Sequence, residues 1–175
     1  MLTSAGFEKV ETLVTFERLL DNDVSDAHGT TLGGAEAASQ SVEIARTAFR
    51  DDRFHRDTRV PKDGADELKA RWVANSFAGR ADAIVVRHEN ERVVGFCACL
   101  YREPHAVIDL IATAPDAQGR GHGRALVAGA LAHYTGQAQA MRVGTQLDNH
   151  RSRKLYVESG FVEVSRADTF HWVAT

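Results

Sequence analysis

The sequence is poor in cysteine and in long apolar runs. Its two cysteines, Cys97 and Cys99, lie two positions apart in a strand-like segment, without the geometry that a disulfide needs. A disulfide-stapled scaffold is therefore excluded, and both residues are expected to be buried. The longest apolar run, Ala125–Ala132, is far shorter than the roughly 20 residues that span a bilayer. No basic segment followed by an apolar one marks a signal peptide, so a cytoplasmic location is the default expectation.

A large excess of charge of one sign is also lacking. The 175 residues include 21 Lys and Arg against 24 Asp and Glu, which gives a formal net charge of −3. The basic footprint of a nucleic-acid-binding protein is thus absent at the level of the whole chain. With 43% hydrophobic and 26% charged residues, the composition excludes a disordered chain and predicts one globular unit. The histidines show no metal-ligand spacing, so we expect no metal.

Hydrophobic periodicity predicts a mixed α/β fold. The expected elements are a strand at Phe7–Arg18, a loop at Asp21–Gly34, a helix at Ala35–Phe49, a charged loop at Arg50–Gly64, a helix at Ala65–Ala78, a hairpin of Ile84–Arg87 with Val93–Tyr101, a strand at Val107–Ala114, a helix at Gly123–Tyr134, a strand at Met141–Leu147, a helix at Asn149–Ser159, and closing strands at Phe161–Val164 and Thr169–Val173. The strands on either side of the third helix need a crossover connection, so we expect them to be parallel.

The N-terminal segment echoes the C-terminal one. Five residues recur at a constant offset: Gly6, Phe7, Val10, Thr15 and Phe16 return as Gly160, Phe161, Val164, Thr169 and Phe170. Chance similarity between two β segments explains this echo, or else residues 1–20 are the remnant of an upstream unit. We accordingly divide the chain into a strand segment at 1–20, a linker at 21–34 and a main domain at 35–175.

The sharpest local signal is the segment Gln118-Gly-Arg-Gly-His-Gly123, which follows a strand and opens a helix. Its glycines let the backbone approach a ligand without hindrance from Cβ atoms. The free N–H groups of the first helical turn, together with the helix dipole, favour an anion there. The segment therefore predicts a phosphate or pyrophosphate site, rather than a plain flexible loop. It matches neither the dinucleotide-binding Gly-x-Gly-x-x-Gly spacing nor a P-loop.

These residues resemble the pyrophosphate loop of the GNAT superfamily of acyl-CoA N-acetyltransferases, Arg/Gln-x-x-Gly-x-Gly/Ala, at Gln118, Gly121 and Gly123. The preceding run Asp109-Leu-Ile-Ala-Thr-Ala-Pro115 is similar to the family's splayed strand. Downstream, Asn149-His-Arg-Ser-Arg-Lys-Leu-Tyr156 and Glu158-Ser-Gly-Phe161 are similar to its second signature. The resemblance covers about residues 80–175, and it rests on two separate motifs in the right order.

The resemblance implies the GNAT fold, an α/β fold whose mixed, mostly antiparallel sheet contains one splayed parallel strand pair and is flanked by helices. It also implies an acyltransferase that uses acetyl-CoA as co-substrate and acetylates a primary amine directly. The residues that it assigns to acetyl-CoA binding are Ile111, Ala112, Thr113, Gln118, Gly119, Arg120, Gly121, His122, Gly123, Arg124, Asn149 and Ser152. For Asn149, a role as the N-cap of a helix is a competing interpretation.

The family pattern also implies catalytic roles. Tyr156 would protonate the departing CoA thiolate, because a phenol with a pKa of about 10 is still protonated at neutral pH. Ordinary aromatic packing is the alternative for this residue. The attacking amine must lose a proton, and Asp109 is the first candidate base, with His105 the second. A structural ion-pair role for Asp109, or reliance on water, is the alternative.

The segment Arg50–Pro61 is the candidate acceptor site. It gathers four arginines around Phe54 and His55, which describes either a solvated charged loop or an anion site in which arginines bind phosphate and aromatic rings stack on a base or sugar. Over about residues 44–175 the chain resembles the dTDP-fucosamine acetyltransferase group, which acetylates nucleotide-linked amino sugars. The candidate acceptor-binding residues are Arg53, Phe54, His55 and Trp72.

Three functions follow from these observations. The first is an N-acetyltransferase for an amino sugar, in particular a nucleotide-linked one. The second is an N-acetyltransferase for a protein N-terminus or another small amine. The third is a non-catalytic acyl-CoA-binding module, which the presence of Tyr156 and of an intact glycine loop disfavours. We expect a small-molecule amine as partner, no nucleic acid or membrane, and, by analogy with small sheets, a homodimer.

Overall fold

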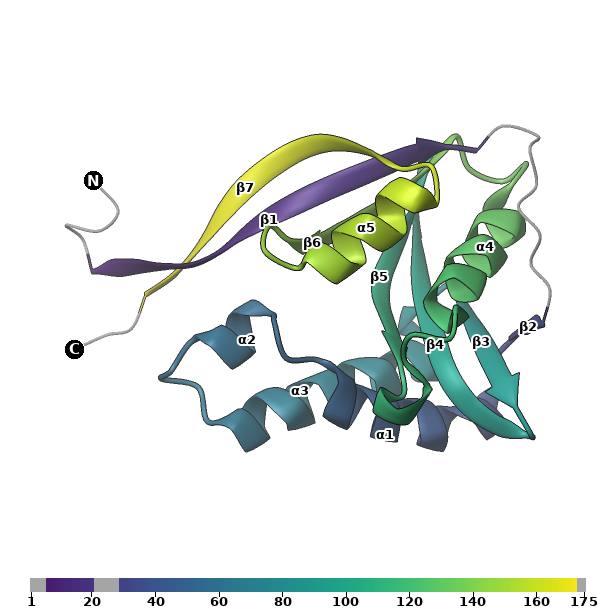
Figure 1. Cartoon of the computed structure of the whole chain (residues 1–175), viewed down its shortest axis with the longest axis horizontal. Helices are drawn as coiled ribbons and strands as arrows, with labels where there is room; N and C mark the ends of the chain where they lie inside the picture. Colours follow the sequence, from purple (N-terminus) through teal and green to yellow (C-terminus); the bar gives the residue numbers. More distant parts are fainter. Residues whose placement is uncertain (1–5, 21–28, 173–175) are drawn as a thin grey trace.

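Seven strands form one sheet in the computed structural model of this chain, which describes residues 6–20 and 29–172 (Figure 1). The strands are β1 (Phe7–Leu19), β2 (Thr30–Leu32), β3 (Ala83–Glu89), β4 (Arg92–Arg102), β5 (His105–Thr113), β6 (Ala140–Gln146) and β7 (Val162–Trp172). Their order is β2-β3-β4-β5-β6-β1-β7, and all neighbours are antiparallel except β5 and β6. The predicted α/β class and the predicted parallel pair are both confirmed.

Helices cover both faces of this sheet. They are α1 (Ala38–Ala48), α2 (Arg53–Arg56), α3 (Lys62–Asn75), α4 (His122–Tyr134) and α5 (His150–Glu158), with single turns at Ala35–Ala37, Ser76–Arg80 and Pro115–Ala117. Leu126 of α4 belongs to one buried apolar cluster, whereas Ile44 of α1 and Val73 of α3 belong to another. None of the described helices combines the length and apolarity that crossing a bilayer requires.

Strand β4 separates the two clusters, because its side chains alternate between the faces of the sheet. Cys97 and Cys99 point into the cluster under α4, while Phe96 and Ala98 point into the cluster under α1 and α3. All four residues are buried. The two cysteines are free thiols of the core, as the sequence predicted.

The parallel strands β5 and β6 separate part of the way along their length. Their ladder runs from the pair His105–Ala140 to the pair Ile108–Val143 and stops there. Both strands continue, β5 as far as Thr113 and β6 as far as Gln146. Beyond the last pair, the facing backbone groups of the two strands no longer bond to each other. The sheet therefore opens at the carboxyl ends of its only parallel pair among the described strands.

The N-terminal strand is an internal member of the sheet. β1 pairs with β6 along Leu13–Leu19 and with β7 along most of its length, so it lies between them. Val14 and Phe16 are buried in the cluster under α4. The predicted strand at Phe7–Arg18 is thus confirmed. The division of the chain at residue 35, and the origin of residues 1–20 as a remnant, stay predictions.

Three expectations for the connecting segments need correction. The loop expected at Asp21–Gly34 contains β2, which extends the sheet beside β3; residues 21–28 lie outside the described part. The charged loop expected at Arg50–Gly64 contains α2, whose first turn is capped where the Asp52 carboxylate accepts a hydrogen bond from the Phe54 N–H at 2.9 Å. α3 also begins within that expected loop, at Lys62.

The two closing strands form the single strand β7. A β-bulge in the pairing with β1 leaves Val164 without a direct partner, and the strand continues beyond it to Trp172. The polar residues between the two apolar stretches therefore do not interrupt the strand, because β1 supplies a continuous partner. The predicted end of the preceding helix is confirmed, since Gly160 adopts the left-handed conformation with φ +81°.

Substitution of Phe16 by Ala tests whether β1 is an integral part of the fold. Because the Phe16 ring is buried in the core, we expect Phe16→Ala to lower the free energy of unfolding by about 3–5 kcal/mol in chemical denaturation. Leu19→Ala, on the same strand but with Leu19 exposed, is the matched control and should cost far less. Equal, small losses for both variants would show that β1 is dispensable.

Candidate active site

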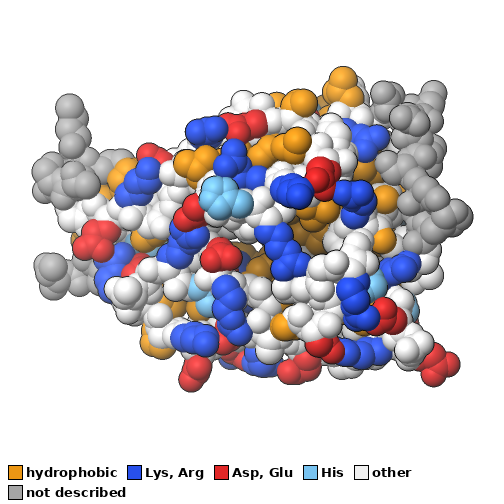
Figure 2. Space-filling view, viewed as in Figure 1, with side chains coloured by type: hydrophobic (Ala, Val, Ile, Leu, Met, Phe, Trp, Pro, Cys, Tyr) orange, Lys and Arg blue, Asp and Glu red, His pale blue; other side chains and the backbone are white. Residues whose placement is uncertain are grey.

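A cleft of about 1300 Å³ lies where β5 and β6 separate. Its walls come from β1, β5 and β6, from the glycine loop before α4, from α5, and from the segment spanning α1, α2 and α3. Figure 2 shows a hollow on this face, with hydrophobic side chains in its depth and basic side chains around it. Most of the predicted site residues line this one cleft, and the exceptions are Arg120 and His55.

The glycine loop forms one end of the cleft. Gly119 and Gly121 have φ values of +79° and +84°, a backbone conformation that residues with a Cβ rarely adopt. Gly121 is the N-cap of α4 and offers no side chain to the N–H groups of the first turn. Those groups are left for a ligand, so the loop has the features of the predicted anion site.

The side chains around the loop differ in where they point. Arg120 donates a hydrogen bond to Glu89 at 2.8 Å, so its side chain turns away from the cleft, contrary to the expectation from the sequence. Arg124 lines the cleft and pairs with Glu158 at 2.6 Å. His122 is buried at the start of α4, and its Nε2 atom has no hydrogen-bond partner within the described residues.

The segment Ile111–Thr113 forms the β5 wall of the cleft. It follows the last β5–β6 pair, so none of the described ladder pairs joins it to β6. Its β6-facing backbone groups are thereby available to an extended ligand lying along the strand. This arrangement has the features that the sequence predicted for the arm of acetyl-CoA.

Asn149 and Ser152 meet at the start of α5. The Asn149 side-chain oxygen accepts a hydrogen bond from the Ser152 N–H at 3.1 Å, which makes Asn149 the N-cap of the helix. The competing structural interpretation of Asn149 is therefore confirmed. Both residues also line the cleft, and the Asn149 side-chain N–H₂ group is not used by the cap.

Tyr156 reaches the cleft from within the core. The residue is 2% exposed, and its ring lies against Phe16 and Phe161, with centroids 6.0 and 5.9 Å away. Burial raises the pKa of the Tyr156 phenol well above its ordinary value, so the hydroxyl stays protonated. The packing role is thus observed together with a neutral hydroxyl that lines the cleft, which leaves the residue able to donate a proton.

The two candidate bases differ in position. Asp109 lines the cleft, but its carboxylate forms a two-point ion pair with the Arg80 guanidinium. The structural alternative for Asp109 is therefore observed. His105 lies outside the cleft lining, with its Nε2 atom 3.9 Å from a Glu17 oxygen.

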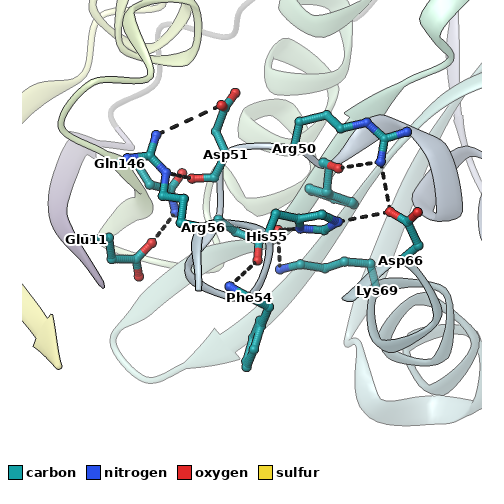
Figure 3. Close-up of polar contacts among 11 residues, drawn as sticks. Glu11, Arg50, Asp51, Phe54, His55, Arg56, Asp66, Lys69 and Gln146 are labelled. Atoms are coloured by element: carbon teal, nitrogen blue, oxygen red, sulfur yellow. Dashed lines mark hydrogen bonds and ion pairs between the residues drawn. The ribbon is translucent and has the colours of Figure 1, made fainter. Parts of the chain in front are cut away.

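Glu11 on β1 is a cleft residue that sequence reasoning missed. It is 6% exposed, and its two oxygens accept hydrogen bonds from Gln146 Nε2 at 2.9 Å and Thr169 Oγ1 at 3.3 Å (Figure 3 draws the first). Five carboxylates line the described cleft: Glu11, Asp51, Asp52, Asp109 and Glu158. Of these five, Glu11 is the one with no basic side chain within 4.0 Å of its oxygens.

The four arginines of the charged segment are not equivalent. Three of them are held in ion pairs of 2.6–2.8 Å: Arg50 with Asp66, Arg56 with Asp148, and Arg59 with Asp57. Arg53, in contrast, has no carboxylate partner within the described part of the chain. It lies over the Phe54 ring, 4.8 Å from the centroid, and both residues line the cleft. Arg53 is therefore the arginine left for an anionic ligand.

His55 is a buried strut and not part of the cleft wall. Its Nδ1 atom lies 2.7 Å from an Asp52 oxygen and its Nε2 atom 3.0 Å from an Asp66 oxygen (Figure 3). These contacts join α2 to α3 behind the cleft. The expectation that His55 touches the acceptor is therefore not what the geometry favours, because both ring nitrogens already face carboxylates.

Lys69 is the second cleft residue that sequence reasoning missed. Its ammonium lies 4.7 Å from the centroid of the Trp72 ring and 5.1 Å from that of Phe49, and 3.5 Å from an Asp52 oxygen. Burial lowers the pKa of Lys69, an effect that the Asp52 carboxylate opposes. Trp72 packs edge-on against Phe54. Aromatic faces and basic groups thus stand together at this end of the cleft.

Metal ligands are not grouped in the described ranges, 6–20 and 29–172: no three His, Cys, Asp or Glu side chains come together there.

Comparison with known proteins gives a consistent result. The family model described as the Acetyltransferase (GNAT) family matches residues 43–161. The spore coat polysaccharide biosynthesis protein SpsD of Bacillus subtilis is 32% identical over 120 residues, which cover 68% of this chain and 42% of that protein. The dTDP-fucosamine acetyltransferase of Escherichia coli O6:H1 is 30% identical over 166 residues, which cover 91% of this chain and 69% of that protein.

Solved structures share the fold. The GCN5-related N-acetyltransferase of Sphaerobacter thermophilus superposes with a TM-score of 0.68 at 16% identity, over 97% of this chain and 53% of that one. A GNAT-family protein of Novosphingobium aromaticivorans described as a putative acetyltransferase gives a TM-score of 0.64 at 14% identity, over 92% and 64%. The chain spans less than two thirds of the length of these structures and of the spore coat protein.

A charge placed in the glycine loop tests the anion site. We expect Gly121→Glu to abolish binding of coenzyme A in calorimetry, because the new carboxylate would oppose a pyrophosphate at the start of α4. Gly136→Glu is the matched control. Gly136 has nearly the same φ, +78°, and equally open surroundings, but it lies in a turn outside the cleft lining. Coenzyme A binding that survives Gly121→Glu would place the pyrophosphate elsewhere.

Proposed function

The chain belongs to the Acetyltransferase (GNAT) family, whose members use acetyl-CoA, and from this premise we propose that it acetylates the primary amine of a small molecule, in particular a nucleotide-linked amino sugar. The observation that carries the proposal is the continuity of the cleft. One cavity joins the glycine loop, the Tyr156 hydroxyl, the Glu11 carboxylate and the aromatic and basic wall around Arg53.

The donor half of the cleft is proposed to bind acetyl-CoA through backbone groups. The N–H groups from Gly119 to Gly123 would hold the pyrophosphate, and the β6-facing edge of Ile111–Thr113 would hold the arm that carries the acetyl group. The Asn149 side-chain N–H₂ group faces the same space and would donate to that arm. Acetyl-CoA supplies the acetyl group as a thioester. Cys97 and Cys99 are core residues outside the cleft lining, which favours direct transfer to the amine.

Tyr156 is proposed to give its proton to the sulfur atom of the departing thiol. Two features support this role: the hydroxyl lines the cleft, and burial keeps it protonated by raising the pKa of the phenol. A proton donor in this position contributes roughly 10²–10⁴-fold in rate. The packing against Phe16 and Phe161 would fix the ring in the orientation that this transfer needs.

Glu11 is proposed to take the proton that the acceptor amine must lose. Its carboxylate is held by two neutral hydrogen-bond donors and has no cationic partner, so an acceptor ammonium would be its counter-charge. Asp109, the base that the sequence favoured, already has its negative charge offset by Arg80. We therefore assign to Asp109 the role of holding Arg80 at the cleft wall.

The wall around Arg53 is proposed to select the acceptor. Arg53 would bind a phosphate, while Phe54 and Trp72 would stack on the sugar or base. The names of the two relatives, one in spore coat polysaccharide biosynthesis and one acting on dTDP-fucosamine, point to the same class of acceptor. A peptide N-terminus is the second candidate, but an acidic groove would suit it better than Arg53 and Lys69 do.

A panel of acceptors tests the proposed function. Release of free thiol from acetyl-CoA should be fastest with nucleotide-linked amino sugars, slower with free amino sugars, and slowest with peptides. Tyr156→Phe should lower turnover by roughly 10²–10⁴-fold on the preferred acceptor, with acetyl-CoA affinity nearly unchanged. Activity on peptides alone would overturn the sugar assignment, and unchanged turnover in Tyr156→Phe would remove that residue from the mechanism.

The two carboxylates can be separated by matched amide substitutions. On any acceptor that the enzyme uses, we expect Glu11→Gln to lower kcat by roughly 10²-fold or more, because the amide cannot take a proton. Raising the pH should restore part of that loss, since more of the amine is then already neutral. Asp109→Asn should change kcat much less. The reverse order of the two effects would return the role of base to Asp109.

A further inference from the structure

Strand β7 is a long, uncovered edge of the sheet. The opposite edge, β2, has only 3 residues, whereas β7 has 11 (Figure 1). Every residue from Val162 to Asp168 is exposed, and Trp172 is 56% exposed. Within the described part of the chain, the backbone of this strand makes no hydrogen bond outside its ladder with β1. Such an edge is a template for another strand.

The side chains of β7 complement those of a second, antiparallel copy. If two copies pair about a two-fold axis at Ala167, residues whose numbers are equally far from 167 lie opposite each other. The opposed pairs are Arg166 with Asp168, Ser165 with Thr169, Val164 with Phe170, Glu163 with His171, and Val162 with Trp172. Each pair occurs twice by symmetry, and each joins opposite charges, two hydroxyls, an acid with a histidine, or an aliphatic with an aromatic residue.

Neighbouring registers lose this complementarity. A slip of one position in the sum of paired numbers sets Glu163 against Phe170 in one direction and against Trp172 in the other. A slip of two positions sets Arg166 against its own copy, or Asp168 against its own copy. Like charges directly opposite each other destabilise a sheet. The register centred on Ala167 is therefore the best of the five.

Charged side chains on an edge often prevent pairing, so their arrangement decides between the two effects. In β7 the two central charges are opposite in sign, and both are exposed. Arg166 now pairs with Glu163 of its own strand, and Asp168 with Lys9 of β1. The bulge at Val164 lies to one side of Ala167, within a strand that is regularly paired from Ser165 to Thr169.

We propose that this chain forms a homodimer in which β7 pairs with β7 of a second copy, antiparallel and centred on Ala167. The two seven-stranded sheets then become one. The interface also adjoins the active site, because Thr169 of β7 donates to Glu11 and His171 lies 2.6 Å from Asp57, in the loop after α2. This proposal does not depend on the proposed acetyl transfer.

Sedimentation across a wide range of concentration tests the proposal on the full chain. The wild type should approach twice its mass of 19.1 kDa as the concentration rises. Emission from Trp172 should shift to the blue in parallel, because pairing shields the indole. A wild-type chain that remains monomeric at the highest concentration would overturn the proposal.

Two charge variants locate the interface. Arg166→Asp and Asp168→Arg each set like charges against each other in both central pairs, so each alone should weaken dimerisation by at least tenfold. Mixing the two variants should restore a dimer, because each central pair then joins one acid with one base. Arg71→Asp, on an exposed arginine of α3, is the matched control and should dimerise as the wild type does.

Circular dichroism and coenzyme A binding would establish that both variants fold. A dimer that withstands Arg166→Asp, or folded variants that fail to associate when mixed, would place the interface elsewhere and refute the pairing of β7 with itself.

Discussion

The architecture depends on the end of one hydrogen-bond ladder. β5 and β6 pair only as far as Ile108 and Val143, and both strands then continue without each other. Unpaired strand backbone is costly unless a ligand or water satisfies it. The gap therefore provides both the space of the cleft and a reason for a ligand to occupy it. The glycine loop and α5, which meet at this gap, would have little to bind if the two strands remained paired.

Charge compensation divides the cleft into parts that hold the structure and parts that are free to react. Most of its acidic groups already face a guanidinium, an ammonium or an imidazole, which makes them struts between elements. Glu11 and Arg53 are the exceptions, one of each sign, and they stand in the half of the cleft away from the glycine loop. A molecule with an amine and a phosphate carries the two charges that these residues lack.

Local motifs were predictable from the sequence and tertiary contacts were not. The glycine loop, the N-cap Asn149 and the helix that carries Tyr156 depend on neighbours within a few residues, and each was found. The role of His55 depends on Asp66, eleven residues away, so its burial could not be foreseen. Glu11 reaches the cleft only because β1 enters between β6 and β7, a choice of partner that no periodicity in β1 encodes. Lys69 on α3 was missed because its aromatic surroundings come from three separate segments.

The placement of β1 also bears on how the protein folds. β1 pairs with β7 at separations as large as that between Phe7 and Trp172. Closing so long a loop is entropically costly, and domains rich in such contacts fold slowly. Glu11 receives the Thr169 hydroxyl across 158 positions of sequence. The reactive half of the cleft is thus assembled by the last and slowest contacts, so catalytic competence would appear only after the donor half has already folded.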